Sequence, residues 1–215
     1  KGVESWKEQE LARGDLFEEE IEAIHQVATE AEQIAIRTLR KLPIDEWETV
    51  TDPAGIPMVE YHFTVPLKGW DGFHGYIDWV GRHKPTGQIW LVDWKVRKSF
   101  QPYEAEEVNL QNAAYQYAVY RILRKPPAGT ITFQISDKPP TRPKLNKDGT
   151  MSRALIKTDW ETYKAALLEA SLNPDDYLDM AEKLSTVEFF RPVKEYRTLD
   201  TVRQVWKEVI EPTAR

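Results

Sequence analysis

The N-terminal part of the chain has the periodicity of an amphipathic helix. Between residues 7 and 41, apolar side chains recur every three or four positions among acidic ones. Gly14 predicts a start or a kink near that point, and Pro43 predicts the end of the helix. From residue 58 the period changes to two, which predicts a strand over 58–65.

The middle of the chain predicts a sheet with a crossover helix. Strands are expected over 75–82 and 88–96, joined by a turn, so that they continue the first strand as an antiparallel meander. Helical spacing returns over 105–124, and a further strand is expected at 130–135. A crossover through that helix would place the last strand beside the one at 88–96.

The remainder of the chain predicts a loop and then helices. Residues 136–150 are rich in Pro, Lys and Arg, which is typical of an exposed loop or arm. Helices are expected over 159–170, 174–185 and 198–210. We therefore predict an α/β protein in which a mixed sheet is flanked by helices, with a helical C-terminal tail, in a single domain over 1–215.

Composition excludes several classes of protein. The chain is 41% hydrophobic and 30% charged, and no apolar run approaches the roughly 18 residues that cross a bilayer, so no membrane contact is expected. It has no Cys, which excludes disulfides, a thiol nucleophile and a thiolate-held iron–sulfur cluster, and favours a reducing compartment, the cytoplasm. The net charge is −9 over residues 1–60, +7 over 61–158 and −4 over 159–215. The basic middle is suited to phosphate contacts, although solvated loop charges would give the same pattern.

Two carboxylates lie on the neighbouring strands expected at 75–82 and 88–96. Asp78 and Asp93 have apolar neighbours, where a carboxylate is costly unless it binds a cation or accepts hydrogen bonds. Strand alternation places Lys95 on the same face as Asp93. Two carboxylates and one ammonium on a face can bind Mg²⁺ and hold a water beside it. An ordinary ion pair between Asp93 and Lys95 remains the alternative.

Three motifs in this region resemble those of a known nuclease superfamily. They are Gly75-x-x-Asp78 on a strand, Asp93-x-Lys95 on the next strand, and Gln111-x-x-x-Tyr115 on the following helix. In this order they resemble the RecB-like branch of the PD-(D/E)xK nuclease superfamily, with phage-type exonucleases among its members. The resemblance covers a core of about residues 58–135 and implies a restriction-endonuclease-like fold.

The resemblance also implies an activity. It is that of a Mg²⁺- or Mn²⁺-dependent deoxyribonuclease, an exonuclease in recombination, repair or phage DNA processing, in the cytoplasm of a bacterial or phage-infected cell. The partners implied are DNA and a single-strand-annealing or single-strand-binding protein. Because the chain has no Cys, the iron–sulfur cluster of some members is excluded.

The resemblance assigns roles to the motif residues. Asp78, Asp93 and the backbone carbonyl of Trp94 would be metal ligands, and Lys95 would orient or deprotonate the attacking water. Gln111 and Tyr115 would contact the DNA end, unless they only pack the helix against the sheet. A further ligand is expected either on the first helix, where His25 competes with Glu18, Glu19 and Glu22, or on the first strand, at Glu60.

DNA is expected to follow basic residues away from this site. The path would run over Arg97 and Lys98 toward the arm at 136–150, which carries Lys144 and Lys147. Trp70, in a Gly-rich loop, is a candidate for stacking on an unpaired base, with core packing as its alternative. Two other functions stay open: a catalytically silent nuclease-like protein that binds DNA or acts as a scaffold, and a protein whose acidic N-terminal helix docks on a partner.

Overall fold

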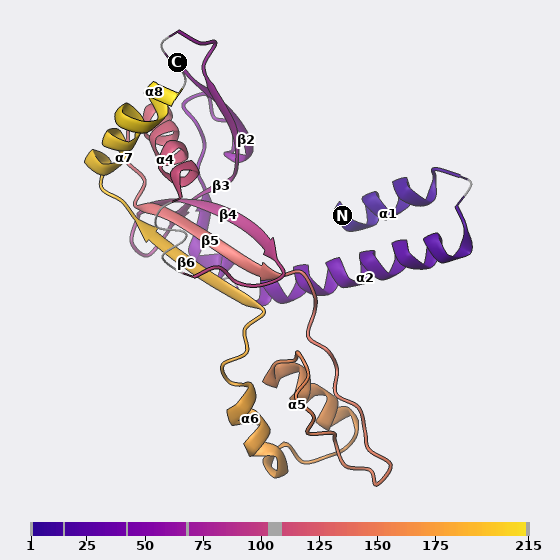
Figure 1. Cartoon of the computed structure of the whole chain (residues 1–215). Helices are drawn as coiled ribbons and strands as arrows, with labels where there is room; N and C mark the ends of the chain where they lie inside the picture. The colour runs from indigo at the N-terminus through magenta and orange to yellow at the C-terminus, as the bar shows by residue number, and fades with distance from the viewer. Residues whose placement is uncertain (1, 15, 42, 68, 103–108, 214–215) are drawn as a thin grey trace. The chain divides into compact units, whose positions relative to one another are not determined.

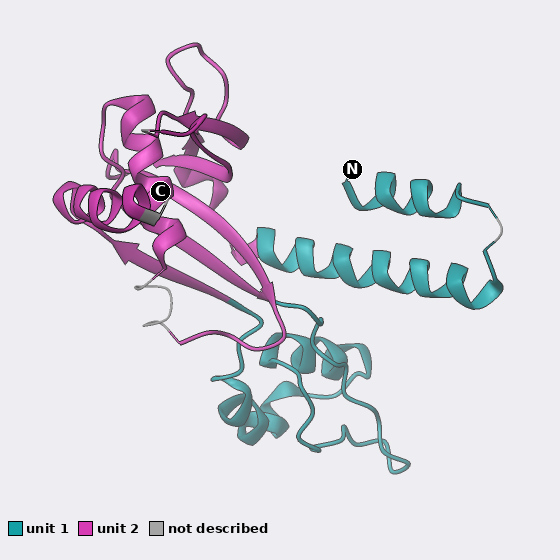
Figure 2. Ribbon diagram, turned by 45° about the horizontal axis from the view of Figure 1, so that its top comes forward, with its two compact units in different colours: residues 1–39, 136–190 teal, residues 40–135, 191–215 magenta. Residues whose placement is uncertain are grey.

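The chain is organised as two compact units. The computed structural model describes residues 2–14, 16–41, 43–67, 69–102 and 109–213. The first unit combines residues 1–39 with 136–190, and the second combines 40–135 with 191–215 (Figure 2). The single domain expected over 1–215 stays a prediction, because two compact units of one chain can belong to the same domain.

The first unit contains the N-terminal helices and a small helical module. The helix expected over 7–41 is divided into α1 (Gly2–Leu11) and α2 (Glu18–Lys41), and the break contains Gly14, whose φ is +71°. The module consists of α5 (Trp160–Glu169), the 3₁₀ turn η2 (Pro174–Tyr177) and α6 (Leu178–Leu184). Its core is built from seven buried side chains: Met151, Tyr163, Ala166, Leu167, Tyr177, Met180 and Leu184.

Asp159 connects α2 to this module. Its side chain caps α5 by accepting a hydrogen bond of 2.9 Å from the amide of Thr162, and it also forms an ion pair with Arg37 of α2.

No helix within the described residues is long and apolar enough to cross a membrane.

The second unit is built around a mixed sheet. Its strands are β1 (Trp47–Thr49), β2 (Val59–Val65), β3 (Phe73–His83), β4 (Ile89–Arg97), β5 (Gly129–Ser136) and β6 (Phe190–Tyr196). The order is β1-β3-β4-β5-β6, and β2 also pairs with β3. β1, β2 and β4 are all antiparallel to β3, whereas the arrows of β4 and β5 point the same way in Figure 1. The predicted α/β class, the meander and the position of β5 beside β4 are confirmed.

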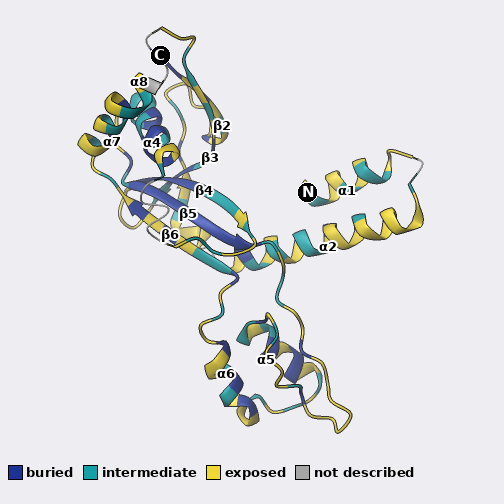
Figure 3. Cartoon of the chain, viewed as in Figure 1, coloured by how far each residue is buried: buried dark blue, intermediate teal, exposed yellow. Residues whose placement is uncertain are grey.

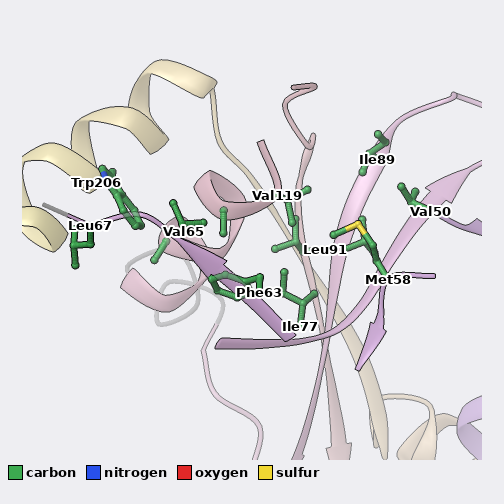
Figure 4. Close-up of a cluster of buried hydrophobic side chains, with 13 residues drawn as sticks. Val50, Met58, Phe63, Val65, Leu67, Ile77, Ile89, Leu91, Val119 and Trp206 are labelled. Atoms are coloured by element: carbon green, nitrogen blue, oxygen red, sulfur yellow. The ribbon is translucent and has the colours of Figure 1, made fainter. Parts of the chain in front are cut away.

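Helices from two distant parts of the sequence complete this unit. They are α4 (Leu110–Leu123), α7 (Leu199–Val205), the π-helical turn η3 (Trp206–Ile210) and α8 (Glu211–Thr213), and a 3₁₀ turn η1 (Ile44–Glu46) precedes β1. Buried side chains of the sheet and of α4 form one core, in which Phe63, Ile77 and Leu91 lie close to Val119 (Figure 4). Trp206 joins this core and stacks on Tyr117, with ring centroids 4.5 Å apart.

The C-terminal tail differs from the prediction because it contains a strand. β5 is buried along its whole length and lies between β4 and β6 (Figure 3). β6 therefore covers one edge of β5. Of the residues of β6 itself, only Val193 and Glu195 are buried. Since one of these two is a carboxylate, the apolar alternation that marks a strand is missing, and the sequence predicts only helices in the tail.

Gly129 allows β5 and β6 to approach closely. A Cβ atom at this position would lie 1.8 Å from the carbonyl oxygen of Glu195. Gly129→Ala should therefore force the two strands apart and lower the free energy of unfolding by about 3 kcal/mol, the upper end of the usual cost of overpacking. Urea unfolding measures the change. The control is Gly2→Ala, where the added Cβ meets nothing within 4 Å. Equal stability of the two variants would contradict the close approach.

Candidate active site

The two carboxylates lie where β3 and β4 separate. The two strands pair from Arg82↔Ile89 to Trp79↔Val92. Asp78 and Asp93 are the next residues, and beyond them β3 continues beside β2 while β4 continues to Arg97. The amide of Trp94 donates a hydrogen bond of 2.9 Å to Oδ2 of Asp78. A side-chain oxygen of β3 thus accepts this hydrogen bond in place of a backbone carbonyl. We call this place the strand fork.

One pocket at the strand fork brings the three sequence motifs together. Asp78 and Asp93, both half-buried, line it from the sheet, and Gln111 and Tyr115 line it from α4. The remaining lining residues are Tyr76, Ile77, Leu91, Val92, Asn112 and Thr130. Four of the residues singled out from the sequence therefore surround one cavity.

Lys95 contacts one of these two carboxylates, that of Asp93. Its Nζ lies 2.9 Å from Oδ1 of Asp93, and the two side chains are 33% and 20% exposed. The contact follows from strand alternation, which places residues two apart on one face. It equally fits an ordinary ion pair, so that the distance alone does not assign a catalytic role to Lys95.

An N-cap fixes where α4 begins. The side chain of Asn109 accepts hydrogen bonds from the amides of Gln111 (3.0 Å) and Asn112 (3.4 Å). α4 therefore starts at Leu110, and Gln111 and Tyr115, four residues apart, share one helix face. The helix expected from residue 105 begins later, and its predicted first residues 105–108 lie outside the described part of the chain.

A buried polar network, which the sequence did not predict, holds this end of α4. Asn112 donates a hydrogen bond of 2.9 Å to Oε2 of Glu195, which forms an ion pair with Arg197. Arg197 in turn donates to the carbonyl oxygen of Asn109 at 3.2 Å. The only sequence signal is an acidic and a basic residue two positions apart, which is informative only once β6 is known.

Gly75 couples two of the motifs sterically. A Cβ at this position would lie 2.8 Å from the hydroxyl of Tyr115 and 2.8 Å from the ring of Phe63. The ring of Tyr115 packs edge-on against Phe63, with centroids 5.1 Å apart. The glycine of the first motif therefore leaves the space that the tyrosine of the third motif occupies.

The additional ligands proposed from the sequence are divided between the units: Glu60 is on β2, in the second unit with the two aspartates, and the candidates on α2 are in the first unit. Val59 pairs with Trp79 and Tyr61 pairs with Ile77, so that Glu60 falls opposite Asp78 in the β2–β3 register. Glu60 is exposed, and its φ is +46°. Among the described residues, no group of three or more His, Asp or Glu side chains lies close enough to hold a metal. His25 is exposed on α2, in the first unit, as are Glu18, Glu19 and Glu22.

The residues expected to contact DNA are spread over both units. In the second unit Arg97 is half-buried at the end of β4, Lys98 is exposed, and Trp70 is 60% exposed. Lys144 and Lys147 are exposed in the first unit. The exposure of Trp70 argues against core packing as its role.

Compared with known proteins, the sequence matches no family model and no curated protein. The resemblance to PD-(D/E)xK nucleases therefore rests on the three motifs alone.

The buried network should be important for stability. Arg197→Ala would leave the carboxylate of Glu195, a residue only 4% exposed, without this cation, at a cost of about 3 kcal/mol or more. Arg82→Ala is the control, because Arg82 and Glu48 form an exposed pair at 3.4 Å that should contribute less than about 1 kcal/mol. Urea unfolding of both variants gives the comparison. An equal, small loss in the two would show that the network does not hold α4.

Proposed function

We propose that the chain is a divalent-metal-dependent deoxyribonuclease that hydrolyses phosphodiester bonds. The observation that carries the proposal is the pocket at the strand fork, where Asp78, Asp93, Gln111 and Tyr115 come together from separate elements and Lys95 contacts Asp93. The order of the motifs favours an exonuclease of recombination, repair or phage DNA processing with a restriction-endonuclease-like fold. We place it in the cytoplasm of a bacterial or phage-infected cell, with a single-strand-annealing or single-strand-binding protein as a candidate partner.

The donor atoms at the strand fork fit a hard divalent cation. Asp78, Asp93 and the backbone carbonyl of Trp94 offer oxygen ligands, which Mg²⁺ and Mn²⁺ prefer. Two carboxylates beside one ammonium leave an excess of negative charge, and a divalent ion would relieve their repulsion. A bound ion would lower the pKa of a water molecule and offset the charge that develops on the phosphate.

The protein's own groups would position the reactants. The ammonium of Lys95, beside Asp93, would orient the attacking water and stabilise negative charge. The amide of Gln111 and the hydroxyl of Tyr115 can donate hydrogen bonds to a phosphate in the pocket. No nucleophilic side chain is needed, because water attacks the phosphorus.

A catalytically silent DNA-binding or scaffold protein is the second candidate. The observation that favours it is that no group of three or more His, Asp or Glu side chains among the described residues could hold a metal ion. An end-labelled DNA assay with Mg²⁺ or Mn²⁺, and with EDTA as the control, distinguishes the two functions. Metal-dependent cleavage supports the nuclease, whereas binding without cleavage under both metals supports the silent protein.

Lys95→Ala tests the proposed chemistry. Turnover should fall by about 10²-fold or more, while the affinity for DNA stays within about 1 kcal/mol, because the ammonium acts mainly in the transition state. Single-turnover cleavage and binding by fluorescence anisotropy measure the two quantities. Lys125→Ala removes an exposed lysine after α4 and should leave both unchanged. A Lys95 variant that loses stability but keeps its specific activity would identify a structural ion pair instead.

The basic arm should contribute to DNA binding through two of its cations. Lys138 forms an ion pair with Glu30 at 2.9 Å, and this hydrogen bond raises the pKa of the lysine, while Arg142 forms an ion pair with Glu169. Lys144 and Lys147 are exposed, and no ion pair joins them to another described residue. They are therefore available for phosphates.

Replacing both Lys144 and Lys147 by Ala should weaken DNA binding at low salt. The slope of log K against log salt should become shallower by about 0.7 to 0.9 for each phosphate that the protein no longer neutralises. Lys138→Ala is the control and should change the slope less, because Glu30 already holds that ammonium. Binding curves of the double variant that overlay those of the parent at every salt concentration would show that the arm is a solvated loop.

A further inference from the structure

Three ring side chains cover the outward face of the β2–β3 hairpin. The rings of His62 and Tyr76 lie with centroids 4.9 Å apart, and those of His62 and His74 are stacked at 6.1 Å with an interplanar angle of 10°. His62 is the cross-strand partner of Tyr76. All three residues are exposed, with Tyr76 at 63%. We call these three residues the ring face.

The hydrophobic core does not account for the ring face. Along β2 the core takes the alternate residues Phe63 and Val65, which are buried, so that His62 points to the other side. The ring of His74 is held in place by a hydrogen bond of 2.9 Å between its Nδ1 and Oγ1 of Thr64. The three rings therefore lie outside the hydrophobic core, and they are exposed to solvent, where a ligand can reach them.

The ring face is continuous with the pocket at the strand fork. Tyr76 belongs to the ring face and also lines the pocket, two residues before Asp78 on β3. From Tyr76 the rings continue to His62 and then to His74. Thr64, the cross-strand partner of His74, extends this row with a neutral side chain, and the exposed carboxylate of Glu60 follows beyond His62 on β2.

We propose that the ring face binds the unpaired bases of single-stranded DNA by stacking and leads that strand into the pocket. The proposal rests on the nuclease function for the pocket, and it specifies the substrate as a strand with unpaired bases. Stacking on aromatic side chains is available to any base once it is unpaired, because every base has a π-face. Bases within a duplex are stacked on one another and cannot lie flat on a sheet.

The test uses a fluorescein-labelled oligo(dT) and a blunt duplex of the same length, with EDTA present to prevent cleavage. The double variant His62→Ala/Tyr76→Ala should bind the single strand about 10- to 100-fold more weakly and bind the duplex as the parent does. Tyr76→Phe keeps the ring and should bind oligo(dT) like the parent. Tyr196→Ala is the matched control, because it removes a tyrosine that is 64% exposed on β6, away from the ring face.

The outcomes separate this proposal from the nuclease function. Unchanged binding of oligo(dT) by the double variant would overturn the ring face as a DNA site and would leave a protein partner as its occupant. An equal loss for single strand and duplex would overturn the preference for unpaired bases. If oligo(dT) binding depends on the rings but Mg²⁺ and Mn²⁺ produce no cleavage, the ring face stands and the nuclease function fails.

Discussion

The end of the β3–β4 ladder at Trp79↔Val92 is the constraint on which the site depends. Where two strands part, their backbone groups need new partners, and here the carboxylate of Asp78 accepts the hydrogen bond of the Trp94 amide. The alternation of β3 also changes at this point, because Ile77 and Val80, three residues apart, both enter the core. The consecutive residues Tyr76, Ile77 and Asp78 line the pocket next to this change.

The position of α4 over the strand fork depends on two contacts with different physical origins. One is steric, since Gly75 leaves room for the hydroxyl of Tyr115. The other is electrostatic and buried, since Glu195 accepts a hydrogen bond from Asn112 and is held by Arg197. Because β3 and β6 are far apart in sequence, the orientation of the helix is a tertiary property. A change in either strand would move the groups that line the pocket.

Local periodicity explains which parts of the fold the sequence could predict. The strand expected at 130–135 is observed as Gly129–Ser136, and the one at 88–96 as Ile89–Arg97, because alternation and helical spacing are local properties. β6 was missed because a buried carboxylate, Glu195, occupies one of its inward positions and is acceptable there only with its tertiary partners. For the same reason, the motif residues of the site were predicted and the network that holds them was not.

One segment of β3 would also link the proposed hydrolysis to the proposed binding of unpaired bases. Tyr76 and Asp78 lie two residues apart on β3, on either side of the buried Ile77, so they share one face of the strand. The outward row that contains Tyr76 therefore ends at a pocket which α4 also lines. A DNA strand stacked on the rings would therefore meet Asp78 and Asp93 where the ring face adjoins the pocket. Stacking and hydrolysis would then depend on the same segment of β3, so that a substitution that displaces Tyr76 and Asp78 should impair both functions together.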